Sequence, residues 1–260
     1  MPQGHNLPSV TGTNRAARAS DPRVPGGSSS AARAGGLDEV RSGAAGAPGL
    51  SLTERRKAAT RMEIARAAAG LFMRHGLRAT RAEDIARAAG VAPRTFYRYF
   101  AGKEECLAPL FSAGVEKWAE AVRDAPADLS VPEALRHAVV RTLTPGVGVR
   151  AESMDWVRAL LRLAEGSPAL LRVWGEACQG AERTLARVLE ARAFAAGGGA
   201  GALAGGRAEF RLGAAVAGAA VRVAVEAWAA GDEPADGPAG PVALAVRHLE
   251  ALRDFPWGTV

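Results

Sequence analysis

Apolar side chains recur at helical spacing in the segment that follows residue 50. Ser51 and Glu54 have the Ser-x-x-Glu spacing of a capping box, in which each side chain binds the other residue's backbone amide at a helix start. Gly76 stands where a left-handed residue can end a helix. Between them, one apolar stripe runs through Ile64, Ala68, Leu71 and Phe72. The pattern predicts a helix over about residues 52–75.

Two shorter helices are expected next. The first spans about residues 82–89, buries Ile85 and Ala86, and ends at Gly90. The second begins at Pro93, because the fixed φ angle and missing N–H of proline suit the first helical position. It continues through the aromatic residues that follow.

The rest of the chain has the same periodicity. Further helices are expected between Gly102 and Val122, over about 131–143, around Trp156 to Leu161, from Pro168 to Leu189, over 207–230 and over 241–254. The glycine-rich residues 197–206 are expected to form a loop. Strands are not expected, because no segment alternates apolar and polar residues over a useful length. The prediction is an all-α fold with about nine helices.

Length and composition restrict the class of protein. The 260 residues suffice for one or two domains with a substantial core. Residues 1–50 hold nine glycines, five prolines and six serines without apolar periodicity, so a disordered tail is expected there. No run approaches the roughly 18 to 20 apolar residues of a membrane span, and the start lacks the apolar core of a signal peptide. With two cysteines, Cys106 and Cys178, we expect a cytoplasmic protein with free thiols and no membrane partner.

Positive charge is concentrated in one part of the chain. Residues 54–103 hold twelve basic and four acidic side chains, whereas residues 104–260 hold sixteen and twenty. A compact basic unit joined to a slightly acidic one is typical of a polyanion-binding module, because neutralised phosphates supply most nonspecific affinity for nucleic acid. A solvated helical surface would have the same composition.

Motifs of enzymes and metal sites are not found. The four histidines are scattered, without His-Glu-x-x-His spacing. Gly102 and Lys103 lack the glycine five positions earlier that a phosphate-binding loop requires, and no serine lies in a Gly-x-Ser-x-Gly turn. Cys106 and Cys178 fall on apolar helix faces, which favours burial over nucleophilic chemistry. We expect no catalytic residues, no metal and no cofactor.

The run from Thr80 to Lys103 has a helix-turn-helix pattern. Gly90 makes the turn, and Val91 holds the second helix against the first, so that its start can enter a DNA major groove. At this point the chain resembles the tetracycline-repressor (TetR) family of bacterial regulators. The residues that carry the resemblance are Gly76, Thr80, Asp84, Ile85, Ala86, Ala89, Gly90, Val91, Thr95, Phe96, Tyr97, Phe100, Lys103, Glu104, Glu105 and Leu107.

The resemblance implies a set of DNA contacts. Arg94 and Thr95 would face base edges and phosphates, Tyr97 and Tyr99 would donate hydroxyls to phosphates, and Lys103 would anchor a phosphate. The family usually has Ser or Thr where this chain has Arg81, and Ser where it has Ala92. The complete expected set is Thr80, Arg81, Pro93, Arg94, Thr95, Tyr97, Arg98, Tyr99 and Lys103, with Arg55, Arg56 and Lys57 at the start of the first helix.

The resemblance also implies how the rest of the chain is used. We expect residues 51–103 to form the DNA-binding domain and residues 104–254 to form a ligand-binding and dimerisation domain. Dimer contacts are expected on the last two long helices, at Ala217, Ala220, Val221, Ala224, Trp228, Val246 and Leu249. An apolar cavity is expected at Leu107, Phe111, Trp118, Leu135, Val139, Trp156, Leu160, Trp174 and Cys178. A dry core would use the same residues.

The predicted function is that of a homodimeric regulator, most simply a repressor, that binds a palindromic operator in double-stranded DNA. A small apolar or amphipathic effector would release it. Residues 156–174 are similar to the effector domain of TetR-like regulators thought to bind acyl-coenzyme-A-like ligands. Two alternatives remain at this point: a constitutive DNA-binding regulator without an effector, and a small helical enzyme or carrier that uses the C-terminal core.

Overall fold

The computed structural model describes residues 51–147, 151–195, 203–255 and 257 of the chain, and it omits the side chains of residues 151, 152 and 203–206. Within those ranges the chain is helical and contains no strand, as predicted. The expected tail at 1–50 lies outside the described residues. The helices are α2 (Leu52–Ala79), α3 (Ala82–Ala88), α4 (Pro93–Tyr99), α5 (Ala108–Arg123), α6 (Val131–Leu143), α7 (Ala151–Glu165), α8 (Pro168–Ala195), α9 (Leu203–Ala230) and α10 (Pro241–Ala251).

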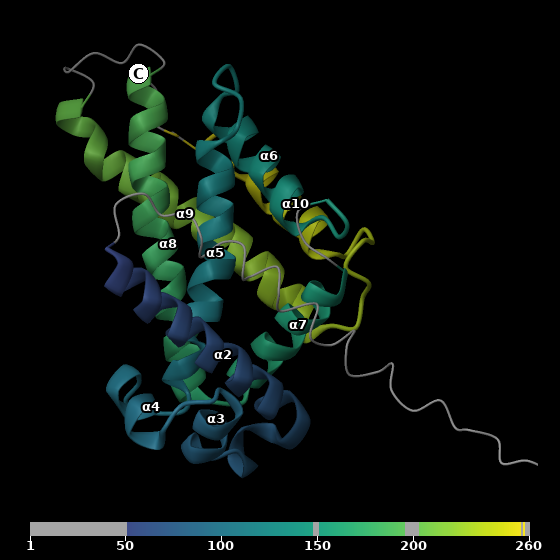
Figure 1. Ribbon diagram of the computed structural model, residues 1–260. Coiled ribbons are helices and arrows are strands. Elements are labelled where there is room, and N and C mark those ends of the chain that lie inside the picture. Colours follow the sequence, from purple (N-terminus) through teal and green to yellow (C-terminus); the bar gives the residue numbers. More distant parts are fainter. Residues whose placement is uncertain (1–50, 148–150, 196–202, 256, 258–260) are drawn as a thin grey trace, which may run out of the picture.

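The helices α2, α3 and α4 gather at one end of the molecule, drawn at the bottom of Figure 1. Ser51 begins α2 with the predicted capping box, since the Ser51 backbone N–H donates to Glu54 at 2.9 Å and the Glu54 N–H donates to the Ser51 hydroxyl at 3.2 Å. The helix is interrupted at Gly76, whose φ of 78° is the left-handed conformation expected there. One irregular turn then completes α2.

A tight turn at Gly90 (φ 68°) joins α3 to α4. The Val91 N–H donates to the Ala86 carbonyl oxygen at 2.9 Å, which holds the start of α4 against α3. Ile85 and Phe96 are completely buried in the same hydrophobic core. The two short helices therefore form the predicted helix-turn-helix unit, packed against α2.

The remaining helices form the larger part of the molecule. α5 and α8 lie side by side (Figure 1), and α9 contacts α7, α8 and α10. α5 and the short 3-10 turn before it, residues Glu105–Leu107, contact α2. This contact joins the helix-turn-helix end of the molecule to the larger helical part.

Several helix boundaries differ from the prediction: α2 ends at Ala79 and α8 at Ala195, four and six residues later than expected, and three other boundaries are shifted as well. The long helix beyond Gly102 begins at Ala108 after a 3-10 turn, because Pro109 lies in its first turn and cannot continue an earlier helix. α9 begins at Leu203, inside the expected loop, because a glycine at a helix end costs only about 1 kcal/mol. α10 ends at Ala251, three residues early, where the chain continues in a turn.

Among the residues that the structure describes, one helix, over Arg207–Ala230, is long and apolar enough to cross a membrane by length and composition alone. A core helix meets the same test, and this helix packs against three others. In its most apolar window 39% of the residues are buried. Apolar surface therefore remains on its outer side.

Candidate DNA interface

The side chains of α4 divide between core and surface. Phe96 and Phe100 are buried, with ring centroids 5.7 Å apart. Pro93, Arg94, Tyr97 and Arg98 are exposed, and Thr95 is half-buried. The buried phenylalanines fix which face of this short helix points outward, and that face carries two guanidinium groups and one phenol.

Tyr97 extends across the exposed surface towards α3. Its hydroxyl donates to a carboxylate oxygen of Glu83 at 3.2 Å, and its ring packs edge-on against Phe96. The hydrogen bond to Glu83 is the main cause of a raised pKa for the Tyr97 phenol, because losing the proton would place two negative oxygens together. Tyr97 therefore remains protonated and can act as a hydrogen-bond donor.

Tyr99 lies at the end of α4 and is half-buried. The Arg98 guanidinium lies 5.4 Å from the centroid of the Tyr99 ring. Arg61 of α2 donates to the Tyr99 carbonyl oxygen at 3.1 Å and stacks 4.7 Å from the Phe100 ring centroid. Arg61 thus fixes the end of α4, a role that its sequence position did not indicate.

The structure corrects the prediction that Thr80 contacts DNA. Its side chain is 2% exposed, and its hydroxyl donates to the Gly76 carbonyl oxygen at 2.9 Å. The last carbonyls of a helix lack partners within the helix, and this hydroxyl satisfies one of them. Thr80 is therefore part of the end of α2.

Lys103 is also engaged within the protein. Its ammonium donates to the Leu77 carbonyl oxygen at 2.7 Å and to the Thr80 carbonyl oxygen at 3.0 Å. An ammonium has three donors, so one remains for a phosphate. Lys103 therefore joins the end of α2 to the segment after α4, whatever its role on DNA.

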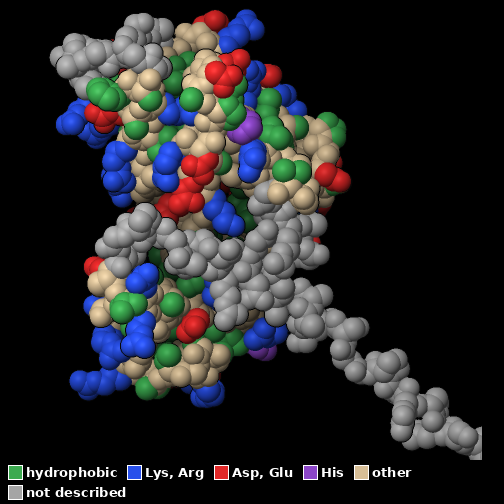
Figure 2. All heavy atoms as spheres, turned by 45° about the horizontal axis from the view of Figure 1, so that its top comes forward, with side chains coloured by type: hydrophobic (Ala, Val, Ile, Leu, Met, Phe, Trp, Pro, Cys, Tyr) green, Lys and Arg blue, Asp and Glu red, His purple; other side chains and the backbone are tan. Residues whose placement is uncertain are grey.

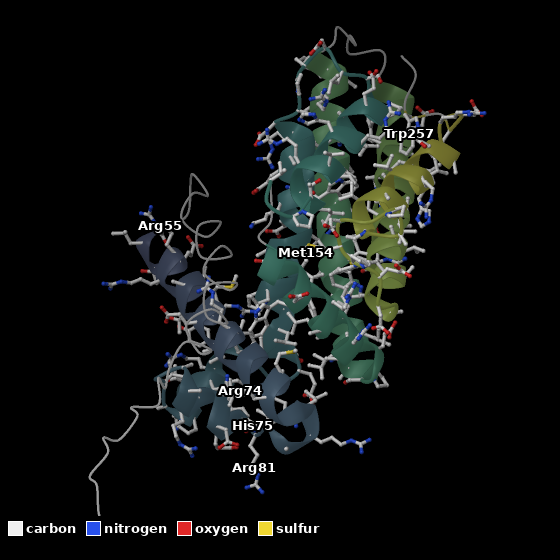
Figure 3. All side chains as sticks on the ribbon, turned by 90° about the vertical axis from the view of Figure 1, so that its right-hand side faces the viewer. Arg55, Arg74, His75, Arg81, Met154 and Trp257 are labelled. Atoms are coloured by element: carbon white, nitrogen blue, oxygen red, sulfur yellow. The ribbon has the colours of Figure 1, made fainter. Side chains whose placement is uncertain are left out.

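Arg81 and Ala92 occupy the N-cap positions of α3 and α4, and neither side chain supplies a cap. Asp84 compensates in α3, because its carboxylate accepts from the Arg81 backbone N–H at 3.2 Å and from Arg87 at 3.1 Å. The exposed Arg81 side chain is left free of the cap and projects from the lower end of the molecule (Figure 3).

The basic residues at the start of α2 lie far from the exposed side chains of α4. Arg55 is at the far end of the helix from His75 and Arg81 (Figure 3). Twenty helical residues rise about 30 Å, so Arg55, Arg56 and Lys57 would meet DNA at a different place from α4. All three are exposed.

In Figure 2, Lys and Arg side chains outnumber acidic ones over the end formed by α2, α3 and α4.

The predicted effector residues come together as a packed core between α5, α6, α7 and α8. Trp156 is half-buried and the other eight residues are buried. The rings of Phe111 and Trp174 meet edge to face with centroids 5.3 Å apart. Two cavities, of about 340 and 390 Å³, lie instead between α2 and α5 and between α2 and α3.

Two tryptophan N–H groups in this core differ in whether they have a hydrogen-bond partner. The Trp174 indole donates to Glu226 of α9 at 2.6 Å. The Trp118 indole N–H is buried and has no hydrogen-bond partner. Leaving a buried donor unpaired costs about 1 to 3 kcal/mol, so an acceptor bound at the Trp118 N–H would gain free energy directly.

The residues expected at the dimer interface lie largely inside one subunit. Ala217, Ala224, Trp228 and Leu249 are at most 4% exposed and Val221 is 9% exposed, because α9 packs against α7, α8 and α10. Ala220 and Val246 are half-buried. The five buried side chains cannot form a surface for a partner, so this expectation is corrected. Periodicity alone did not distinguish the inner face of α9 from its outer face.

The described residues contain no group of three or more His, Cys, Asp and Glu side chains that could hold a metal. Cys106 and Cys178 are buried free thiols. Burial raises the pKa of both thiols, that of Cys178 to about 12, which suppresses the reactive thiolate.

Part of the chain, including the helix-turn-helix unit, is similar to known proteins. Residues 64–110 match the family described as "Bacterial regulatory proteins, tetR family". The HTH-type transcriptional regulator TcmR of Streptomyces glaucescens is 34% identical over 146 residues, which cover 55% of this chain and 65% of TcmR. The mycofactocin biosynthesis transcriptional regulator MftR of Mycobacterium tuberculosis is 33% identical over 93 residues, covering 36% of this chain and 47% of MftR.

The chain thus spans less than two thirds of the length of either relative. Among solved structures, FadR of Thermus thermophilus, a TetR-family repressor in complex with lauroyl-CoA, is 26% identical with a TM-score of 0.47. That match covers 74% of this chain and 92% of the FadR chain. The relatives are regulators of transcription and not enzymes, in agreement with the sequence-based prediction.

Proposed function

We propose that the chain is a member of the tetR family of bacterial regulatory proteins, which its residues 64–110 match, and that it is a homodimeric DNA-binding repressor that acts in the cytoplasm. The observation that carries the proposal is the outward face of α4. Arg94, Tyr97 and Arg98 are exposed there, while Phe96 and Phe100 fix the helix in the core. Residues 51–103 form the DNA-binding domain and residues 104–254 the effector and dimerisation domain.

On DNA, α4 is the recognition helix and enters the major groove. Arg94 lies in its first turn, where a guanidinium can address O6 and N7 of guanine with two parallel hydrogen bonds. Tyr97 and Arg98, one turn later, contact phosphates, together with Arg81 and the remaining donor of Lys103. Arg55, Arg56 and Lys57 contact the backbone or minor groove farther along the duplex.

The test of DNA binding begins from random sequence, because the operator is not known. Duplexes of about 30 base pairs, long enough for two half-sites, are enriched on the purified protein and sequenced. We expect a palindromic motif bound with at least about a thousandfold preference over random duplex. Arg141→Ala removes an exposed arginine of α6 and is the control for the loss of positive charge in Arg94→Ala. Equal affinity for all duplexes would refute sequence-specific regulation.

The second copy covers the outer face of α9. Leu212 is 55% exposed and Val223 is 46% exposed, and both lie on one side of the helix. Val216, Ala219 and Ala227 lie on the same side, half-buried or exposed. A largely apolar helix face of small and branched side chains suits close packing against its own two-fold copy.

The dimer is tested by sedimentation at micromolar concentration. We expect a dimeric mass for the unmodified chain and a monomeric mass for Leu212→Glu and Val223→Glu. Val140→Glu on α6 is the matched control, since Val140 is 44% exposed and lies off this face. A monomeric unmodified chain would remove the dimer from the proposal, and a dimer that survives both α9 variants would place its interface elsewhere.

The effector is a small amphipathic molecule, acyl-coenzyme-A-like in having an acyl chain and a carbonyl. Its carbonyl oxygen accepts from the buried Trp118 N–H, and its chain displaces the packed rings of Phe111 and Trp174. α5 carries Trp118 and also contacts α2, so a ligand that favours another tilt of α5 changes the separation of the two recognition helices. Changing a 99:1 preference to 1:99 requires about 5.5 kcal/mol of differential affinity.

Long-chain acyl thioesters are the first probes for this effector. We expect them to quench tryptophan fluorescence and to release the enriched operator at micromolar concentration. Quenching without release would refute the allosteric claim and leave a constitutive DNA-binding regulator.

A further inference from the structure

One side-chain hydrogen bond joins α3 and α4 on their exposed side. Glu83 lies in the first turn of α3, and its carboxylate accepts the Tyr97 hydroxyl of α4 at 3.2 Å. Tyr97 is 53% exposed, so the contact lies at the surface. It therefore lies on the same face as the exposed side chains of α4.

Glu83 differs from the carboxylate beside it. Asp84 is neutralised by Arg87 and by the backbone N–H of Arg81. Within the described part of the chain, Glu83 has no ion pair, and its one hydrogen bond is the one from Tyr97. An unneutralised carboxylate therefore lies beside the exposed arginines of α4, in contact with one of the residues proposed to bind DNA.

A phenol has a single proton to donate. If the Tyr97 hydroxyl donates to a DNA phosphate, it must leave Glu83, and the phosphate then lies near the Glu83 carboxylate. Two negative groups at about 6 Å repel one another. The hydrogen bond in the free protein is therefore in competition with the phosphate contact.

We propose that Glu83 is a built-in competitor of DNA: it holds the Tyr97 hydroxyl in the free protein and lowers affinity for every DNA sequence. This inference rests on the proposed DNA-binding function. The competition involves a phosphate and not a base, so it weakens operator and random DNA by the same factor. Glu83 thereby limits how long the protein remains on nonspecific DNA without altering which bases it prefers.

The first experiment compares Glu83→Gln with the unmodified protein on a random-sequence duplex and on the enriched operator. We expect tighter binding by about three- to tenfold for each protomer in contact, equally on both duplexes. Glu63→Gln is the matched control, because Glu63 is an exposed carboxylate of α2 for which the described residues show no hydrogen bond or ion pair. Unchanged or weaker binding by Glu83→Gln overturns the proposal, and so does a gain confined to one duplex.

The second experiment separates competition for the hydroxyl from general charge repulsion. Glu83→Gln is combined with Tyr97→Phe, which keeps the ring against Phe96 and removes the proton at issue. We expect the gain from Glu83→Gln to fall by at least half on a logarithmic scale in this background. An undiminished gain shows that Glu83 acts only as a surface charge and overturns the proposed competition.

The third experiment needs no DNA. The chain has two tyrosines, Tyr97 and Tyr99, so Tyr99→Phe leaves one phenol whose ionisation can be followed by ultraviolet absorbance. Glu83 raises the pKa of Tyr97, so Glu83→Gln should shift this titration to lower pH. No shift would overturn the contact itself. Loss of all DNA binding by the unmodified protein, with the shift present, would instead refute the proposed function.

Discussion

The ammonium of Lys103 donates to the backbone carbonyl oxygen of Leu77 at 2.7 Å, across 26 positions of sequence. The same group also donates to the Thr80 carbonyl oxygen at 3.0 Å. Leu77 directly follows the kink at Gly76, and Thr80 is the C-cap residue of α2. Both carbonyls therefore lie where regular helical hydrogen bonding ends. Lys103 therefore holds the turn after α4 against the end of α2.

Replacing Lys103 should accordingly lower stability in the absence of DNA. Lys103→Met removes two charge-assisted hydrogen bonds and should cost about 1 to 3 kcal/mol. Each kcal/mol lost should lower the thermal midpoint, measured by circular dichroism, by about 2 to 4 °C. Lys117→Met on α5 is the control. An unchanged midpoint, with a salt dependence of DNA binding reduced by about one, would make Lys103 a phosphate anchor alone.

Arg94→Ala should weaken operator binding in a base-dependent way. If the guanidinium binds guanine, the loss is about 1 to 3 kcal/mol at the preferred operator, and discrimination is relaxed at one position of each half-site. Titrations of single-base operator variants measure this directly. Equal losses on operator and random duplex would reassign Arg94 to a phosphate.

Gly218 should not tolerate alanine without rearrangement. A Cβ atom there would lie 2.8 Å from Cγ of Glu182, where α8 and α9 approach closely. We expect Gly218→Ala to lose about 1 to 3 kcal/mol of unfolding free energy in a denaturant titration.

Gly175→Ala on α8 is the opposite case, because a Cβ atom there meets nothing within 4 Å. Removing a glycine from a helix interior should raise stability by about 0.5 to 1 kcal/mol.

The cause of the Gly218→Ala loss can be tested with a second substitution. Adding Glu182→Ala to Gly218→Ala should recover part of the lost unfolding free energy. A loss that persists undiminished would show that Glu182 is not its cause.

Trp118→Phe and Trp174→Phe should differ in how much stability they cost. Trp118→Phe removes an unpaired buried N–H, which offsets part of the stability lost with the smaller ring, while affinity for acyl thioesters falls. Trp174→Phe breaks the 2.6 Å hydrogen bond to Glu226 and should cost about 1 to 3 kcal/mol. Chemical denaturation and fluorescence titration measure the two effects. Equal losses of stability would remove the argument for an acceptor at Trp118.

The two cysteines should be inert in the folded protein. Burial raises the pKa of Cys106 and of Cys178, so both remain protonated thiols at pH 8. An aromatic disulfide reagent at that pH should label neither thiol until denaturant is added. Rapid labelling of one thiol in native buffer would show that its helix opens readily.

The sequence by itself determined the helix-turn-helix. Its signals are local: the Ser51 and Glu54 capping box, the positive φ angles at Gly76 and Gly90, and the four-residue spacing of Phe96 and Phe100. Each depends on interactions within one helix or one turn, so the order of residues suffices to predict it. The same is true of the all-α class, because 3.6-residue periodicity is a property of each helix alone.

The tertiary structure decided which groups remain available for binding. The Thr80 hydroxyl and the Lys103 ammonium are used at the end of α2, and no local pattern indicates that they meet there. α9 is apolar on both sides, so its sequence could not show that Trp228 lies inside the subunit and Leu212 outside. The partner of a polar group, or the covered face of an apolar helix, depends on segments far away in sequence, and these are brought together only by packing.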